Sequence, residues 1–229
     1  MHRTLPDYDL DIHAGRALAT LKTPADPVPV DLTSSVQKAL EAIFAARQLR
    51  THLAYTLEEM RICQHRSDGS TSIAITSSET IRVTAHEDLA VTDASGRVLH
   101  DSKAERISEE NRYIDVLLQA AQKHPLVLVL WKSYRAAVDD PGNELIHLYE
   151  IFEALSKHFG AQEKARHCLH FTKAEWQCLK RLGQLANDEP LEQGRHRGRH
   201  PMLRPASPQE LAEARTIAKK LVEAFMSTL

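Results

Sequence analysis

The spacing of hydrophobic residues changes along the chain from a strand-like to a helical period. Between about residues 61 and 99, apolar and polar positions alternate, and Thr, Val and Ile are frequent. A period of two places successive side chains on opposite faces of a strand, so this region predicts a small antiparallel sheet. The predicted strands are STSIAIT (70–76), TIRVTAH (80–86) and LAVTD (89–93), with a hairpin turn at DASG (93–96) before RVL.

Beyond residue 105, apolar residues recur every three or four positions, which is the period of an amphipathic helix. Several of these segments follow a side chain that can accept hydrogen bonds from the first free amides of a helix. The predicted helix starts are Ser108, Asp140 before Pro141, Thr172 with Glu175, and Ser207 with Pro208 and Glu210. The predicted helices are 108–138, 141–159, 173–187 and 208–227.

Two residues define these helices further. Pro125 lies inside the first one, and because proline lacks an amide hydrogen, this helix is expected to be kinked or split in two. The apolar run LVLVLW that follows is compatible with a buried strand, but its flanks favour a helix. Gly160 predicts a left-handed residue at the end of the second helix. The apolar stripe of that helix is Leu145, Leu148, Tyr149, Phe152, Leu155 and Phe159.

Helices that each carry one apolar stripe, mostly joined by short connections, pack economically as an antiparallel bundle. The predicted fold class is therefore α+β, with a small antiparallel sheet region followed by an antiparallel four-helix bundle. Residues 1–33 are expected to be loosely ordered, because Pro24, Pro27 and Pro29 leave few backbone donors.

The remaining domain boundaries follow from one helix signal. Ser34 is followed three residues later by Gln37 and then by an apolar pattern, which predicts a short helix starting there. Residues 34–105 are thus predicted to form a helix-and-sheet domain, and residues 106–229 the helical bundle.

The composition is that of a globular protein, with 42% hydrophobic and 26% charged residues and a formal net charge of −2. The longest apolar run is far shorter than the roughly 20 residues of a membrane-spanning helix, so no membrane segment is expected. No apolar segment follows a basic N-terminus, which predicts a cytoplasmic protein without a secretory signal. Cys63, Cys168 and Cys178 lack CxxC spacing, which indicates reduced and mostly buried thiols.

One stretch departs from this near-neutral charge. EQGRHRGRHPMLRP, at 192–205, holds four arginines and two histidines within ten positions and lies between the third and fourth predicted helices of the bundle. Arg195 and His200 are separated by four residues, and His196 directly follows the arginine. In these residues the sequence resembles the HEPN superfamily, whose members are four-helix bundles marked by an arginine, four to six residues and a histidine, commonly with a polar residue after the arginine.

A second Arg-x4-His match consists of Arg47 and His52. It lies in the N-terminal part of the chain, and its arginine is followed by Gln48. Only the match formed by Arg195 and His200 lies beside the last helix of the predicted bundle, where the HEPN superfamily places its motif. The resemblance covers roughly residues 106–229.

The resemblance implies a metal-independent endoribonuclease, without a cofactor, of a toxin-antitoxin, anti-phage or RNA-processing system. It also implies a homodimer that brings two motifs together, and an antitoxin or another protein as a possible partner. RNA would be cleaved by attack of the 2′-OH on the adjacent phosphate, which requires a proton acceptor, a proton donor and positive charge. One histidine does not supply both proton roles, whereas His200 from each of two protomers does.

The residue types suggest separate roles within the stretch. Arginine offers a planar fork to phosphate oxygens, so we expect Arg195 to position the phosphate. Histidine titrates near neutral pH, so we expect His200 to transfer protons and His196 to orient the site. Three further arginines are expected to bind the RNA backbone, namely Arg197, Arg199 and Arg204. Glu150 or Glu153, on the second helix of the bundle, is within possible reach of this site, and the sequence does not select between them.

Other interpretations fit parts of the same sequence. The basic stretch is also compatible with a non-catalytic HEPN-like module that binds a nucleotide, RNA or a protein partner. A zinc site is a weaker alternative, for which the candidate ligands are His167, Cys168 and His170 with His158 or Cys178. A further set is scattered through the sheet region at irregular spacing, namely His52, Cys63, His65, His86 and His100.

Overall fold

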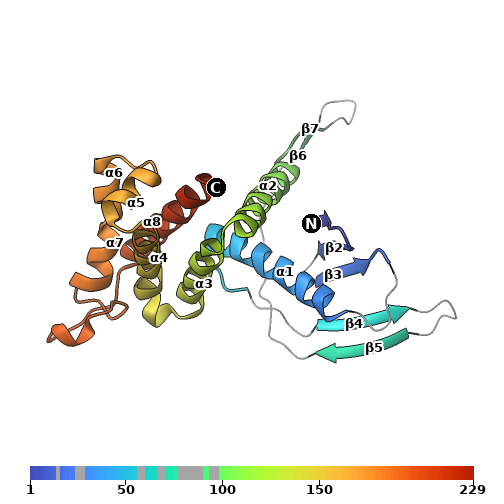
Figure 1. The fold of residues 1–229 in the computed structure, drawn as a ribbon, viewed down its shortest axis with the longest axis horizontal. Coiled ribbons are helices and arrows are strands. Elements are labelled where there is room, and N and C mark those ends of the chain that lie inside the picture. The colour runs from blue at the N-terminus through green and yellow to red at the C-terminus, as the bar shows by residue number, and fades with distance from the viewer. Residues whose placement is uncertain (14–15, 24–28, 56–59, 66–70, 77–89, 93–97) are drawn as a thin grey trace. The chain divides into compact units, whose positions relative to one another are not determined.

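The computed structural model describes most of the chain in two compact units (Figure 1). The described residues are 1–13, 16–23, 29–55, 60–65, 71–76, 90–92 and 98–229, with only the backbone described from 60 to 99. The first unit comprises Met1–Leu40 and Ala54–Arg112, and the second Glu41–Leu53 and Tyr113–Leu229.

The first unit begins with a three-stranded antiparallel sheet in the order β1-β2-β3. Its strands are β1 (His2–Thr4), β2 (Tyr8–His13) and β3 (Arg16–Leu21). Tyr8 and Leu10 alternate with polar residues along β2 and are buried, so the central strand has one apolar face. The sheet lies in the segment for which the prolines predicted loose order, and that expectation was wrong for the strands at 2–4, 8–13 and 16–21.

Helix α1 (Val30–Thr51) follows this sheet. It starts directly after Pro29, whose carbonyl accepts from the amides of Leu32 and Thr33 at 3.1 and 3.2 Å. A helix that starts at Val30 places Ser34 inside its second turn, so the predicted start at Ser34 was four residues late. Proline fits here because the first helical amides need no intrahelical acceptor.

The next four strands form two separate antiparallel hairpins. Strands β4 (Met60–His65) and β5 (Thr71–Thr76) pair with each other, as do β6 (Ala90–Thr92) and β7 (Val98–Asp101). The strands predicted at STSIAIT and LAVTD are therefore confirmed, although each belongs to a different two-stranded sheet. The strand predicted at 80–86 and the turn at 93–96 lie outside the described residues.

Helix α2 (Ser102–Lys123) ends just before Pro125, and α3 (Leu126–Asp139) begins after it, so the predicted split and the helical state of LVLVLW are confirmed. The 3₁₀ turn η1 (Pro141–Asn143) leads into α4 (Glu144–His158). Three short helices follow: α5 (Gln162–Cys168), α6 (Lys173–Leu179) and α7 (Arg181–Gly183). The chain ends with the π-helical turn η2 (Gln184–Asp188), the 3₁₀ turn η3 (Arg197–Arg199) and α8 (Pro208–Ser227).

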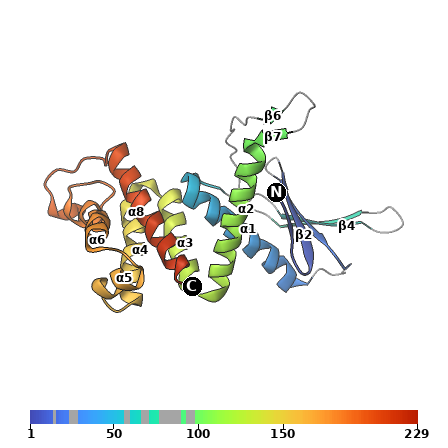
Figure 2. The same ribbon diagram turned by 90° about the horizontal axis from the view of Figure 1, so that it is seen from above.

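Helices α3, α4 and α8 pack against one another in the second unit, and α4 also contacts α5 and α7 (Figures 1 and 2). Their shared core contains fully buried apolar residues, among them Leu130, Leu145, Leu148, Ile151, Leu155, Leu221 and Val222. The mixed class, a small sheet followed by a mostly helical remainder, is confirmed. The helical part contains more segments than the four predicted helices. Helix α5 was not predicted, and the third predicted helix consists of α6, α7 and η2.

Most local signals at helix ends agree with the structure, whereas the helix start predicted at Ser108 does not. Thr172 with Glu175 and Ser207 with Glu210 form complete capping boxes, in which each side chain bonds the amide at the other's position. Gly160 has a φ of +83°, as the end of α4 requires. Ser108 lies inside α2, because that helix starts at Ser102, where the amide of Ala104 bonds the Asp101 carboxylate at 2.9 Å. Within the described residues, no helix has the length and apolar content needed to cross a membrane.

Candidate functional site

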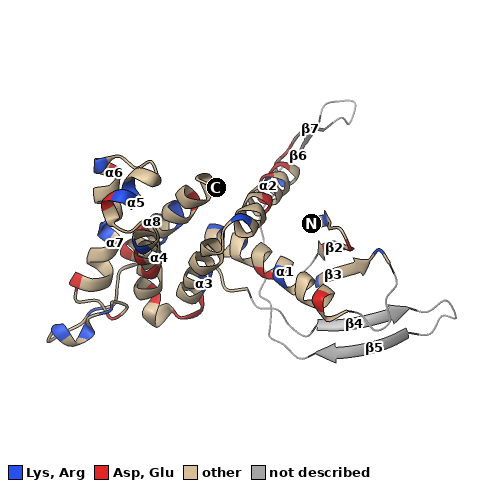
Figure 3. Ribbon diagram, in the orientation of Figure 1, with Lys and Arg blue, Asp and Glu red and all other residues tan. Residues whose placement is uncertain are grey.

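The basic stretch forms most of the connection between η2 and α8, and its arginines appear as blue segments in Figure 3. Backbone hydrogen bonds fold this connection onto itself: the amide of Arg204 donates to Pro190 O and that of Glu192 to Arg204 O, both at 3.0 Å. The Arg195 amide also donates to Ala186 O at 2.6 Å. The connection is thus fixed to the end of η2 immediately before the candidate motif.

Gly194 is needed for this close approach. A Cβ atom at this buried position would lie 3.2 Å from the carbonyl oxygens of both Ala186 and Leu191. These are backbone atoms that cannot move away as a flexible side chain can. The glycine therefore determines where the next residue, Arg195, leaves the connection.

Arg195 lies on the surface of α4. Its two terminal nitrogens donate to the two carboxylate oxygens of Glu153, each at 2.9 Å, and its guanidinium lies 5.6 Å from the ring centroid of Tyr149. The hydrogen bond with Glu153 is the main cause that raises the pKa of Arg195, and the charge of Glu150 adds to it. The structure thus selects Glu153 as the partner of Arg195, a choice that the sequence left open.

The pair of Arg195 and Glu153 is solvent-accessible, with exposed side-chain fractions of 36% and 44%. Ion pairs of this exposure contribute at most about 1 kcal/mol, because water screens them and two long side chains must be ordered. A phosphate that offers two oxygens to the same fork therefore competes with a weak internal partner.

Arg197 contacts the other end of the same helix. Its guanidinium donates to Gly142 O at 2.8 Å and to the side-chain oxygen of Asn143. Asn143 in turn donates to the Asp140 carboxylate at 2.7 Å. The two arginines thus attach the connection near the first and third turns of α4.

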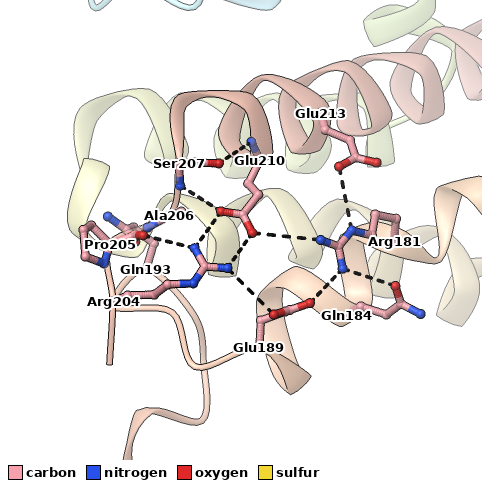
Figure 4. A network of polar contacts seen from close by, with 10 residues as sticks. All are labelled: Arg181, Gln184, Glu189, Gln193, Arg204, Pro205, Ala206, Ser207, Glu210 and Glu213. Carbon is pink, nitrogen blue, oxygen red and sulfur yellow. Dashed lines mark hydrogen bonds and ion pairs between the residues drawn. The ribbon is translucent and has the colours of Figure 1, made fainter. Parts of the chain in front are cut away.

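Arg204 is bonded at the start of α8 (Figure 4). Its fork donates to both carboxylate oxygens of Glu210 at 2.8 and 2.7 Å, and Glu189 lies 3.9 Å away. Arg181 continues the network by donating to Glu189 at 2.9 Å. The hydrogen bond from Arg204 and the amide of Ser207 lower the pKa of Glu210 to about 2. This role is structural, since Arg204 ties the end of the connection to the cap of α8.

The remaining candidates have fewer partners. Arg199 is exposed, and its side chain has no hydrogen bond or ion pair to a residue in the described part of the chain. His196 and His200 are half-buried, and no hydrogen bond joins either ring to Arg195. The Nε2 atom of His200 is shielded from solvent without a hydrogen-bond partner among the described residues. Buried polar atoms are usually hydrogen-bonded, although other described residues, such as Ser156 and Asn187, also have a shielded side-chain atom without a partner.

The Arg47 and His52 match lies elsewhere in the second unit. His52, at a φ of +51°, places Nε2 3.3 Å from Glu144, a carboxylate with 2% exposure that also accepts two hydrogen bonds from Arg215 at 2.6 and 2.9 Å. This buried ion pair joins α4 to α8. No local pattern in the sequence indicates this ion pair, because its members are separated by 71 residues or more.

The zinc hypothesis has no geometric support in the described residues, which contain no group of three or more His, Cys, Asp or Glu side chains able to bind a metal. The Nε2 atom of His167 is instead 2.7 Å from a guanidinium nitrogen of Arg166. Cys168 and Cys178 are exposed, so the expectation of buried thiols was wrong for these two. The side chains of Cys63, His65 and His86 lie outside the described residues.

A third histidine near the connection was missed. His147, on α4, lies 3.4 Å from the Asp140 carboxylate and 3.6 Å from that of Glu150. A sequence signal for His147 was present, since residues 143, 147, 150 and 153 are spaced by three and four and share one helix face.

Comparisons with protein-family models, with curated proteins and with solved structures found no match.

Proposed function

We propose that the protein is a HEPN-like, metal-independent endoribonuclease. The observation that supports this best is the position of Arg195, whose fork is held at the helix surface by an exposed carboxylate. His200 follows in the same connection with a ring nitrogen that has no partner among the described residues. Arginine and histidine supply the two kinds of group that RNA cleavage without a metal requires.

In the proposed reaction, the ribose 2′-oxygen forms a bond to the adjacent phosphorus while the bond from phosphorus to the 5′-oxygen breaks. One base takes the proton of the 2′-OH, and one acid gives a proton to the departing 5′-oxygen. The products are a 2′,3′-cyclic phosphate and a 5′-hydroxyl end. Arg195 would bind the non-bridging oxygens, His200 would transfer protons and His196 would orient the site, with a homodimer supplying a second His200.

The contacts of the other arginines divide the proposed RNA-binding set. The side chain of Arg199 is exposed and has no polar partner among the described residues, which suits a contact with the RNA backbone. Arg197 and Arg204 are bonded to Asn143 and Glu210. Arg199 is therefore proposed as the main backbone contact, while Arg197 and Arg204 contribute charge from fixed positions.

The test is incubation of the purified protein with structured RNA in the presence of EDTA. Cleavage with cyclic phosphate ends is expected, and both His200→Ala and Arg195→Ala should abolish it while leaving the tryptophan fluorescence spectrum unchanged. Lys219→Ala, on the exposed surface of α8, is the matched control and should cleave normally. Activity that EDTA abolishes would contradict the proposal.

A second candidate is a non-catalytic HEPN-like binding module. The contacts of Arg197 and Arg204 favour it, because both guanidinium groups are already bonded to acceptors of their own chain and stabilise the connection. RNA binding without cleavage in the same assay would select this function. Light scattering and copurification would then identify a homodimer or a partner such as an antitoxin.

A further inference from the structure

The α4 surface beneath the connection carries a row of acidic groups. Asp140 precedes the helix, and Glu150 and Glu153 lie on the turns that face Arg195. Three carboxylates beside the arginines oppose the approach of a phosphate, because the phosphate and the carboxylates are both negatively charged. A site meant for RNA therefore needs a way to weaken this negative charge.

His147 lies within this row. Its Nε2 is 3.4 Å from an Asp140 oxygen, which orients the ring, and its Nδ1 is 3.6 Å from Glu150 Oε2. Nδ1 is shielded from solvent and makes no hydrogen bond to a described residue. The imidazole donates from only one nitrogen when neutral, and from both when protonated. A proton on Nδ1 would thus point at Glu150 and complete an ion pair that is now slightly too long for a hydrogen bond.

The other charged groups near His147 are accounted for. Glu144, one turn earlier on α4, is engaged by Arg215 and His52. Two arginines of the connection also contact this row. Arg197 donates to Asn143, whose side chain donates to Asp140, and Arg195 donates to Glu153. Glu150 is the member of the row that has electrostatic contact with Arg195 and no hydrogen-bond donor of its own among the described residues.

We propose that His147 is a positioning residue of this site, which when protonated pairs with Glu150 and thereby reduces the negative charge that opposes an RNA phosphate at Arg195. The proposal rests on the proposed function and adds a pH response to it. RNA binding is then stronger in mildly acidic than in mildly alkaline solution, because imidazole gains its proton as the pH falls. Neutralising one negative charge about 10 Å from a phosphate in water corresponds to an affinity gain of about twofold.

The test uses a background that neither cleaves RNA nor titrates within the motif, the double substitution His196→Gln and His200→Gln. Affinity for a fluorescein-labelled single-stranded RNA is measured by polarisation at about pH 6 and about pH 8, on either side of imidazole titration. The background is expected to bind about twofold more tightly at the lower pH. Adding His147→Gln should remove this difference and leave the weaker affinity at both values.

Two further variants separate positioning from a loss of structure. His147→Lys carries a permanent positive charge and should bind tightly at both pH values, and Glu150→Gln should do the same because the opposing carboxylate is gone. A pH response that persists in His147→Gln, or equal affinities of His147→Lys and His147→Gln, would overturn the role of His147. A background protein that binds no RNA at either pH would instead overturn the proposed function, and this role with it.

Discussion

Removal of the Arg215 guanidinium provides the sharpest test of how the helical unit is held together. Glu144 has 2% exposure and receives two hydrogen bonds from Arg215. In Arg215→Met the carboxylate stays buried with His52 as its remaining partner. Loss of one member of a buried ion pair costs about 3–5 kcal/mol, and since His52 remains, we expect about 3 kcal/mol at neutral pH.

The pH dependence of this loss has a definite sign. Burial raises the pKa of Glu144, but the hydrogen bonds of His52 and Arg215 outweigh it, so the net pKa lies below the ordinary value of 4.5. A carboxyl with a lowered pKa stabilises the fold above its unfolded value, and this contribution disappears as the pH falls through its folded value. Without Arg215, burial dominates and Glu144 accepts a proton more easily. The stability difference between wild type and variant should therefore narrow as the pH falls from the raised pKa of Glu144 in the variant to its lowered pKa in the wild type.

Tryptophan fluorescence in guanidinium reports this unit alone, because the protein's two tryptophans, Trp131 and Trp176, are both in the second unit. The control is Lys219→Met, which removes an exposed α8 pair with Glu223 and should change stability by less than about 0.5 kcal/mol. If Arg215→Met is no less stable than Lys219→Met at neutral pH, or if the difference does not narrow in acid, the reasoning is refuted.

Three further predictions follow from the connection. Glu210→Gln should lower stability by about 1 kcal/mol at neutral pH, because the charged partner of Arg204 and of the Ser207 amide becomes neutral, and the difference should vanish as the pH falls from 4.5 to about 2 in a fluorescence titration. Gly194→Ala should cost about 1–3 kcal/mol in guanidinium unfolding, whereas Gly198→Ala, which meets no atom within 4 Å, should be close to neutral. Light scattering should give a dimer, and a strict monomer would count against a site built from two copies of His200.

Local signals in the sequence predicted local structure well. The capping boxes at Thr172 and Ser207, the break at Pro125 and the end of α4 at Gly160 depend on residues within one helical turn of each other. The N-terminal strands also had a signal, since Tyr8, Leu10 and Ile12 alternate with polar residues, but the neighbouring prolines were given more weight. Those prolines flank the strands and do not interrupt them.

The candidate site was predictable only in its composition. The Arg and His residues of the connection were visible in the sequence, whereas their partners lie far away along the chain: Glu153 is 42 residues from Arg195, and Asn143 is 54 residues from Arg197. Which arginine is bonded internally and which is exposed depends on the packing of α4 and α8, and no local pattern records it. The short helix α5 has only seven residues, too few for a clear apolar period.

The end groups of RNA fragments produced in EDTA test the central claim most directly. The account predicts that the wild-type protein yields fragments with 2′,3′-cyclic phosphate and 5′-hydroxyl ends, identified by mass spectrometry, and that His200→Ala yields none. RNA that stays intact with the folded wild-type protein, or fragments of the same kind and amount from His200→Ala, would contradict it.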